Sequence, residues 1–131
     1  MKEPLFLTLD EVIEIHKDQI QRYGGHIGIR DLELLKSSIN MPAASFGGEY
    51  LHTDVYEMAA AYLFHIIRNH PFMDGNKRTG VVSALVFLIL NGIEFTADED
   101  KLEKMVVSVA EGKSGKSEIA QFFRDNSQPL E

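Results

Sequence analysis

Two helical patterns separated by a seven-residue turn constrain the fold of this 131-residue chain more than any other feature. From Asp54 to Asn69, apolar residues recur at i, i+3, i+4, i+7, i+8, i+11 and i+12, which is typical of an amphipathic helix. From about Lys77 to Leu90 the residues are apolar nearly all round, and such a helix lies in the middle of a domain. The chain is therefore expected to fold around this buried central helix.

The ends of the other helices are marked by capping residues and by helix breakers. Starts are expected at the capping boxes Thr8–Glu11 and Thr96–Glu99, at Asp31 and at about Ser117, and ends at Gly24-Gly25, Asn40-Met41-Pro42 and Asn91-Gly92. The segment Ala43–Leu51 is too rich in glycine for a helix and is interpreted as a flap or short hairpin on the surface. These signals predict an all-α fold of about six helices.

The length fits a single domain, which we place at residues 1–126, with 127–131 as a disordered tail. A net charge of −7 argues against a nucleic acid partner, and the absence of cysteine excludes disulfides and thiolate chemistry. The N-terminus, Met1–Leu7, lacks the apolar region of a secretory signal, and the apolar run Val81–Leu90 is too short to span a bilayer. We expect a soluble cytoplasmic protein that binds no membrane.

The turn His70–Arg78 collects residue types that suit an anion site. The first amides of the following helix have no partner within the helix and, with the helix dipole, attract an anion. Gly75 lets the backbone approach closely, and Asn76 suits a cap position. Lys77 and Arg78 oppose the helix dipole, which makes sense if a polyphosphate lies against them.

Two further side chains of the turn supply chemistry. Asp74 is a hard oxygen ligand of the kind that holds magnesium beside a phosphate. His70 is suited to take a proton from a hydroxyl at neutral pH. Together they indicate transfer of a nucleotide's phosphate to a hydroxyl. The alternative is a purely structural role, in which the turn is an interhelical corner with Phe72 packed in it.

The sequence His-Pro-Phe-Met-Asp-Gly-Asn-Lys-Arg resembles the signature of the Fic/Doc family, His-x-Phe-x-(Asp/Glu)-Gly-Asn-(Gly/Lys)-Arg, which opens a central helix. The lysine variant resembles the Doc, or death-on-curing, toxins of toxin–antitoxin pairs. Similarity to that branch extends to Arg22-Tyr23-Gly24-Gly25, Gly28-Ile29-Arg30-Asp31, the Pro42–Gly48 flap and the helix end at Asn91-Gly92.

The resemblance implies the all-α Fic fold and a role for each matching residue. His70 would activate a target hydroxyl, Asp74 would hold magnesium, and Asn76 would bind phosphate or metal. Lys77 and Arg78 would grip the phosphates of ATP, so that the nucleotide-binding set comprises Phe72, Gly75, Asn76, Lys77 and Arg78.

Two positions depart from relatives that transfer AMP. Those enzymes usually carry glycine at the place of Lys77 and a second arginine at the place of Val81. Both departures favour the Doc branch, which is similar to a protein kinase acting on elongation factor Tu. AMP transfer by the same site is one alternative, and a non-catalytic module that only holds a nucleotide or a partner segment is another.

Self-inhibited relatives resemble one another in a helix that reads (Ser/Thr)-x-x-x-Glu-(Gly/Asn). Here Val107 stands four residues before Glu111, where the motif requires serine or threonine, so the chain lacks this inhibitory helix. We therefore expect a separate antitoxin whose extended or helical segment docks near the flap.

Other motifs have weaker interpretations. The segment Ala110–Ser117 satisfies a loose P-loop pattern, and Val106–Val109 could pass for the strand before it, although no parallel sheet is expected around it. His65 is interpreted as a hydrogen-bonded or solvent-edge histidine. His16, His26 and His52 are interpreted as surface residues.

Overall fold

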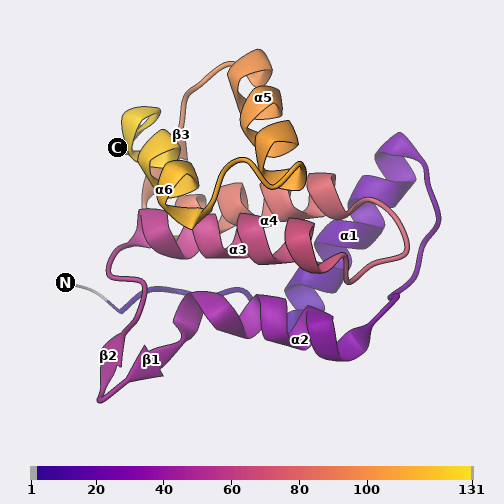
Figure 1. Cartoon of the computed structure of the whole chain (residues 1–131), viewed down its shortest axis with the longest axis horizontal. Coiled ribbons are helices and arrows are strands. Elements are labelled where there is room, and N and C mark those ends of the chain that lie inside the picture. Colours follow the sequence, from indigo (N-terminus) through magenta and orange to yellow (C-terminus); the bar gives the residue numbers. More distant parts are fainter. Residues whose placement is uncertain (1–2, 131) are drawn as a thin grey trace.

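The computed structural model describes residues 3–130, and within them the chain forms six α-helices and two short antiparallel strand pairs (Figure 1). The helices are α1 Leu9–Tyr23, α2 Leu32–Asn40, α3 Val55–Asn69, α4 Asn76–Leu90, α5 Glu99–Ala110 and α6 Lys116–Asp125. A 3-10 turn, η1, covers Met41–Ala43, and the strands are β1 Ser45–Phe46, β2 Glu49–Tyr50, β3 Ile93–Phe95 and β4 Ser127–Pro129. The predicted all-α fold of about six helices is confirmed.

The centre of the molecule is the pair α3 and α4, joined by the turn at His70–Gly75. Helix α2 packs on one side of α3 and α6 on the other, while α1 packs against α4 (Figure 1). Of the two central helices α3 is the more deeply buried, because eight of its residues are buried, against seven in α4. Helix α4 is apolar nearly all round, yet its last turn leaves Ile89 and Leu90 exposed.

Several boundaries lie where the local signals place them. Thr8 and Glu11 form the reciprocal capping box of α1, and Gly24 ends that helix with φ 85°. The carboxylates of Asp31 and Asp54 cap α2 and α3. Each cap satisfies an amide in a first helical turn, which is why these boundaries can be read from short stretches of sequence.

Two boundary predictions are wrong. The cap of α5 is Asp98, whose carboxylate accepts from the amide of Lys101, whereas the predicted cap Thr96 donates its hydroxyl to the carbonyl of Asn126. Residues 127–129, expected within a disordered tail, form β4 and pair with β3 in the register Ile93↔Pro129, Glu94↔Gln128 and Phe95↔Ser127. Both differences arise from one contact between the segment after α4 and the segment after α6.

The Ala43–Leu51 segment forms the predicted hairpin, β1 and β2. It precedes the N-terminus of α3, whereas His70 follows the C-terminus of that helix. Fifteen helical residues, about 22 Å at 1.5 Å per residue, therefore separate the hairpin from the turn (Figure 1). The segment that lies beside the turn is the connection between α1 and α2. No helix within residues 3–130 is long and apolar enough to cross a membrane.

Candidate functional site

The turn between α3 and α4 changes the chain direction through two left-handed residues. His70 ends α3 with φ 49° and ψ 53°, and it is the one non-glycine residue with positive φ among residues 3–130. Gly75, with φ 74°, precedes α4. A non-glycine residue in this region costs free energy and persists where the surroundings fix it. The strain falls on the residue to which the sequence assigns the chemistry.

Asn76 organises the interior of the turn. Its side chain is buried, its Oδ1 accepts from the amide of Phe72 at 3.0 Å, and its Nδ2 donates to the Phe72 carbonyl at 3.1 Å. These two bonds fix the orientation of the amide group, so the same Nδ2 donates to His70 Nδ1 at 3.1 Å. In a neutral imidazole that accepts at Nδ1, the proton resides on Nε2.

Asp74 is exposed and ionised. Its Oδ1 accepts from the amide of Gly75 at 2.9 Å and its Oδ2 from the amide of His26 at 3.2 Å. These backbone hydrogen bonds, first that from His26 and then that from Gly75, lower the pKa of the carboxyl below its ordinary value, with help from the Arg78 charge. Gly25 approaches so closely that a Cβ there would lie 2.6 Å from Asp74 Oδ2. The loop after α1 thus holds the carboxylate in place.

His16 supports the turn from beneath. The side chain is only 2% exposed, its ring stacks on Phe72 with centroids 3.8 Å apart, and its Nε2 lies 2.8 Å from the Asp74 carbonyl oxygen. Burial is the largest cause that lowers the pKa of this imidazole, so the ring stays neutral and Nε2–H donates to the carbonyl. The prediction that His16 is a surface residue is wrong, because helix α1 turns it into the packing under the site.

Arg30 closes the same turn from the loop before α2. Its Nε donates to the His70 carbonyl at 2.6 Å and its Nη2 to the Asn69 carbonyl at 2.9 Å. The amides of Arg30 and Asp31 both donate to the Pro71 carbonyl, at 2.7 and 3.0 Å. Carbonyls at the end of a helix lack partners within the helix, and here the guanidinium of Arg30 donates to two of them.

The start of α4 is open to an anion. Among the described residues no side chain caps it, since its N-cap is Gly75. Lys77 is exposed, whereas Arg78 donates to the Gly24 carbonyl at 2.9 Å and lies over the ring of Tyr23. An uncapped helix start next to two cations attracts phosphate or carboxylate groups.

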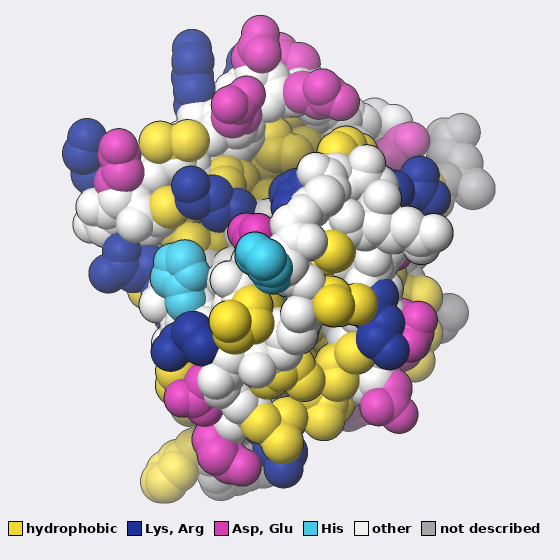
Figure 2. All heavy atoms as spheres, turned by 90° about the vertical axis from the view of Figure 1, so that its right-hand side faces the viewer, with side chains coloured by type: hydrophobic (Ala, Val, Ile, Leu, Met, Phe, Trp, Pro, Cys, Tyr) yellow, Lys and Arg dark blue, Asp and Glu magenta, His cyan; other side chains and the backbone are white. Residues whose placement is uncertain are grey.

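These features meet in one pocket of about 350 Å³, lined by His70, Met73, Asp74, Gly75, Asn76, Lys77 and Arg78. Figure 2 shows that histidine, acidic and basic side chains gather on this face of the molecule. Of the predicted site residues only Phe72 lies outside the lining, because it packs in the core at 1% exposure. Within residues 3–130 no three histidine or acidic side chains could together hold a metal ion. A single carboxylate beside a phosphate site fits magnesium, which usually keeps several waters.

Sequence reasoning did not assign His16, His26 or Arg30 to the site. The signal available for Arg30 was its place in the Gly28–Asp31 stretch next to the family motif, whereas the stack of His16 on Phe72 joins residues far apart in sequence. The P-loop alternative is wrong, since Val106–Val109 lies in helix α5 and not in a strand. His52, predicted on the surface, is buried at 9% exposure. His65 is hydrogen-bonded as predicted, through Lys116.

A small helical domain whose central turn joins a histidine, a carboxylate and an uncapped helix start defines the class of this protein. The model of the Fic/DOC family matches residues 6–88, and the chain belongs to that family. The chain is similar to Protein kinase doc of Escherichia phage P1, at 36% identity over 118 residues that cover 90% of this chain and 92% of that protein. It is also similar to Toxin Doc of Mycolicibacterium smegmatis, at 37% identity over 90 residues that cover 67% and 69%.

Proposed function

We propose that this chain is a Doc-type toxin that transfers the γ-phosphate of ATP to a hydroxyl of a protein target and thereby arrests translation in the cytoplasm. The observation that carries the proposal is the pocket in which His70, Asp74 and the uncapped start of α4 converge. The names of the two similar proteins, a protein kinase and a toxin, agree with it. Elongation factor Tu is the target that the Doc resemblance suggests.

In this proposal His70 takes the proton of the target hydroxyl. The hydroxyl oxygen attacks the γ-phosphorus, the bond from that phosphorus to the bridging oxygen breaks, and ADP leaves. Because Asn76 donates to Nδ1 in the resting turn, Nε2 carries the ring proton there, and Nε2 can accept the hydroxyl proton only after the ring proton has moved to Nδ1. That change gives up one hydrogen bond of about 0.5–1.5 kcal/mol, which an exposed ring can exchange with water.

The remaining residues bind and orient ATP. Magnesium, when bound, would neutralise charge that develops on the phosphates, and Asp74 is the carboxylate that would hold it. The amides at the start of α4 and the Lys77 ammonium would contact phosphate oxygens. Since both polar atoms of the Asn76 side chain are engaged by Phe72, we assign Asn76 to holding the His70 ring in the resting turn and not to contacting ATP.

Two residues favour γ-phosphate transfer over AMP transfer. Lys77 fills the space that glycine leaves in the AMP-transferring relatives and draws the terminal phosphates toward its charge. Val81 stands where those relatives carry a second arginine, so one contact that fixes their phosphate orientation is missing. Both changes favour a nucleotide whose γ-phosphate faces His70.

The test uses ATP labelled at either the α- or the γ-phosphate, with purified elongation factor Tu or with a bacterial extract. We expect label from the γ position on a serine or threonine, dependent on magnesium and lost in Asp74→Ala. Label that arrives only from the α position would establish an AMP transferase. Binding of ATP without transfer of either label, in the presence of extract, would support the non-catalytic module instead.

We further propose that a separate antitoxin inhibits this chain. Neither serine nor threonine stands four residues before Glu111, so the described chain offers no inhibitory helix of the family type. The hairpin β1–β2, near which the sequence placed the antitoxin, lies at the far end of α3 from His70. A segment anchored at the hairpin must therefore extend along α3 to reach the pocket, which is consistent with an extended partner segment.

A further inference from the structure

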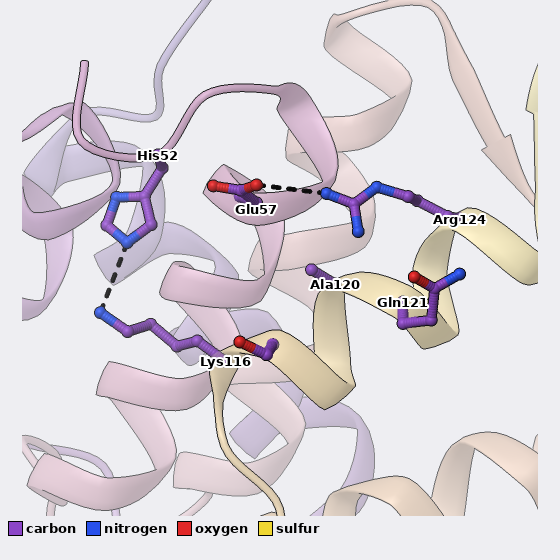
Figure 3. A pocket seen from close by; sticks show the side chains of 7 residues that line it. His52, Glu57, Lys116, Ala120, Gln121 and Arg124 are labelled. Atoms are coloured by element: carbon purple, nitrogen blue, oxygen red, sulfur yellow. Dashed lines mark hydrogen bonds and ion pairs between the residues drawn. The ribbon is translucent and has the colours of Figure 1, made fainter.

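A second pocket, of about 380 Å³, lies where α6 packs beside the start of α3. Its lining comprises His52, Glu57, Lys116, Ser117, Ala120, Gln121 and Arg124, none of which belongs to the pocket at His70. Figure 3 shows Lys116, at the start of α6, reaching His52, and Arg124, near the end of α6, reaching Glu57. Two cations from one helix thus stand at two sides of the pocket.

Lys116 is a half-buried cation with neutral partners. Its Nζ lies 3.4 Å from Nε2 of His52, 3.3 Å from Nε2 of His65 and 5.9 Å from the centroid of the Phe64 ring. No Asp or Glu carboxylate of residues 3–130 forms an ion pair with it. An ammonium taken partly out of water without an opposite charge is costly, so an anion bound beside Lys116 would be stabilised.

The two imidazoles leave one Lys116 proton available. Burial is the largest cause that lowers the pKa of His52 and lowers that of His65 to about 4, and the Lys116 charge acts in the same direction. Both rings are therefore neutral near pH 7, and each accepts one hydrogen bond from the ammonium at Nε2. An ammonium has three N–H donors, so the third has no partner from these rings.

The carboxylate in the lining does not neutralise Lys116, because other groups already engage it. Glu57 accepts from Arg124 Nη2 at 3.2 Å and from the amide and hydroxyl of Thr53 at 3.0 and 3.1 Å. Arg124 also donates to Asp54 Oδ2 at 2.9 Å. Asp54 and Glu57 carry two negative charges against the one on Arg124, but both carboxylates pair with Arg124, so among the described residues Lys116 is the one cation of the lining without a carboxylate partner.

The face of α6 that forms the wall offers space and one neutral donor, the Ser117 hydroxyl, while the Gln121 amide donates to Asp125 at 2.8 Å. Ser117, Ala120, Gln121 and Arg124 follow i, i+3, i+4 and i+7, so they lie on one face of the helix. The small side chain of Ala120 leaves the floor open between the two ends, and the volume falls at the lower end of the range for small-molecule sites.

We propose that this second pocket binds a small oxyanion, a phosphate or carboxylate group, with Lys116 as the charged ligand and Ser117 as a neutral donor. The position of Lys116 and Ser117 in the first turn of α6 adds a favourable helix dipole. The site is independent of phosphate transfer at His70, and its test does not use enzymatic activity.

The test is a titration of the full chain with an anion at about pH 7.5, above the ordinary histidine pKa. Binding is monitored through the ring C–H signals of the histidines in NMR spectra. One arm uses inorganic phosphate and the other sodium acetate. We expect saturable shifts of the His52 and His65 signals, at concentrations on the order of millimolar, in at least one arm. Shifts of the His70 and His26 signals report the first pocket separately.

Matched variants identify the charged ligand. Lys116→Gln should weaken the anion affinity measured at His52 and His65 by about tenfold or more, because a charge-assisted hydrogen bond is lost. Lys104→Gln removes an equal charge from an exposed position on α5 and should leave that affinity unchanged. The proposal is overturned if neither anion gives saturable shifts of these two signals in the wild-type chain, or if Lys116→Gln binds as tightly as the wild type.

Discussion

His70 combines a strained backbone with a side chain held on one edge by Asn76. His70→Ala should lower phosphate transfer by about 10²- to 10⁴-fold, the usual contribution of a general base, while the fold and ATP binding persist. Steady-state transfer of γ-label measures the loss, and circular dichroism checks the fold. His26→Ala is the matched control, since His26 is exposed and its hydrogen bond to Asp74 comes from the backbone amide, which alanine retains. A His70→Ala variant with more than about a tenth of the wild-type rate contradicts the assignment.

Arg30 is the residue whose effect on His70 is indirect. Arg30→Ala removes two hydrogen bonds to the carbonyls of His70 and Asn69, so the backbone that carries the imidazole is held less firmly. We expect kcat to fall between about tenfold and 10²-fold with little change in the KM for ATP, as for a small misplacement of a catalytic group. Arg30→Lys, which keeps the charge but not the paired geometry, should recover only part of the rate.

The control for Arg30 is Arg22→Ala, because Arg22 is exposed and pairs only with Asp18 on its own helix. Equal losses of kcat in the two variants would indicate a general effect of surface charge. An unchanged kcat in Arg30→Ala would show that the backbone bonds to the Pro71 carbonyl hold the turn by themselves.

At the scale of elements, the link between α3 and α6 makes stability depend on pH. The folded pKa of His65 is about 4 and its ordinary value is 6.5, so the unfolded chain binds more protons between these values. The free energy of unfolding should therefore decrease as the pH falls from about 6.5 toward 4. Urea unfolding at several pH values should show a shallower decrease for His65→Gln, which keeps an acceptor for Lys116 but does not titrate.

His26→Gln is the control for this pH dependence, because the imidazole of His26 is exposed and does not pack in the core. Its unfolding free energy should follow the wild-type curve. Identical curves for wild type and His65→Gln would mean that the folded protein accommodates a charged imidazole beside Lys116.

Elements were predictable from the sequence where their signals are local. The caps Thr8, Asp31 and Asp54 each accept a hydrogen bond from an amide three residues ahead, so both partners lie within one short stretch of sequence. Thr96 carries the same signal but fails, because the Asn126 carbonyl, thirty residues away, accepts from its hydroxyl and amide. The tail was misjudged for the same reason, since β4 exists only through its pairing with β3.

In the candidate site too, residues that are contiguous in sequence were predictable, whereas residues brought together by packing were not. The motif His70–Arg78 is contiguous, so its convergence on one pocket follows from the turn itself. His16 and Arg30 reach the turn from α1 and from the loop before α2, and only the packing of those elements brings them there. Local sequence therefore predicted the groups expected to do the chemistry, whereas the groups that hold them in place required the structure.

At the scale of the whole molecule, growth of bacteria tests the toxin proposal independently of purified components. Expression of the wild-type chain alone should arrest growth, because the described residues contain no inhibitory helix of the family type. His70→Ala, expressed to the same level, should permit growth, since the fold remains but the base is absent. Lys116→Gln should arrest growth as the wild type does, because the pocket at Lys116 is independent of phosphate transfer at His70. Co-expression with a cognate antitoxin should restore growth, and harmless high-level expression of the wild-type chain would contradict the toxin proposal.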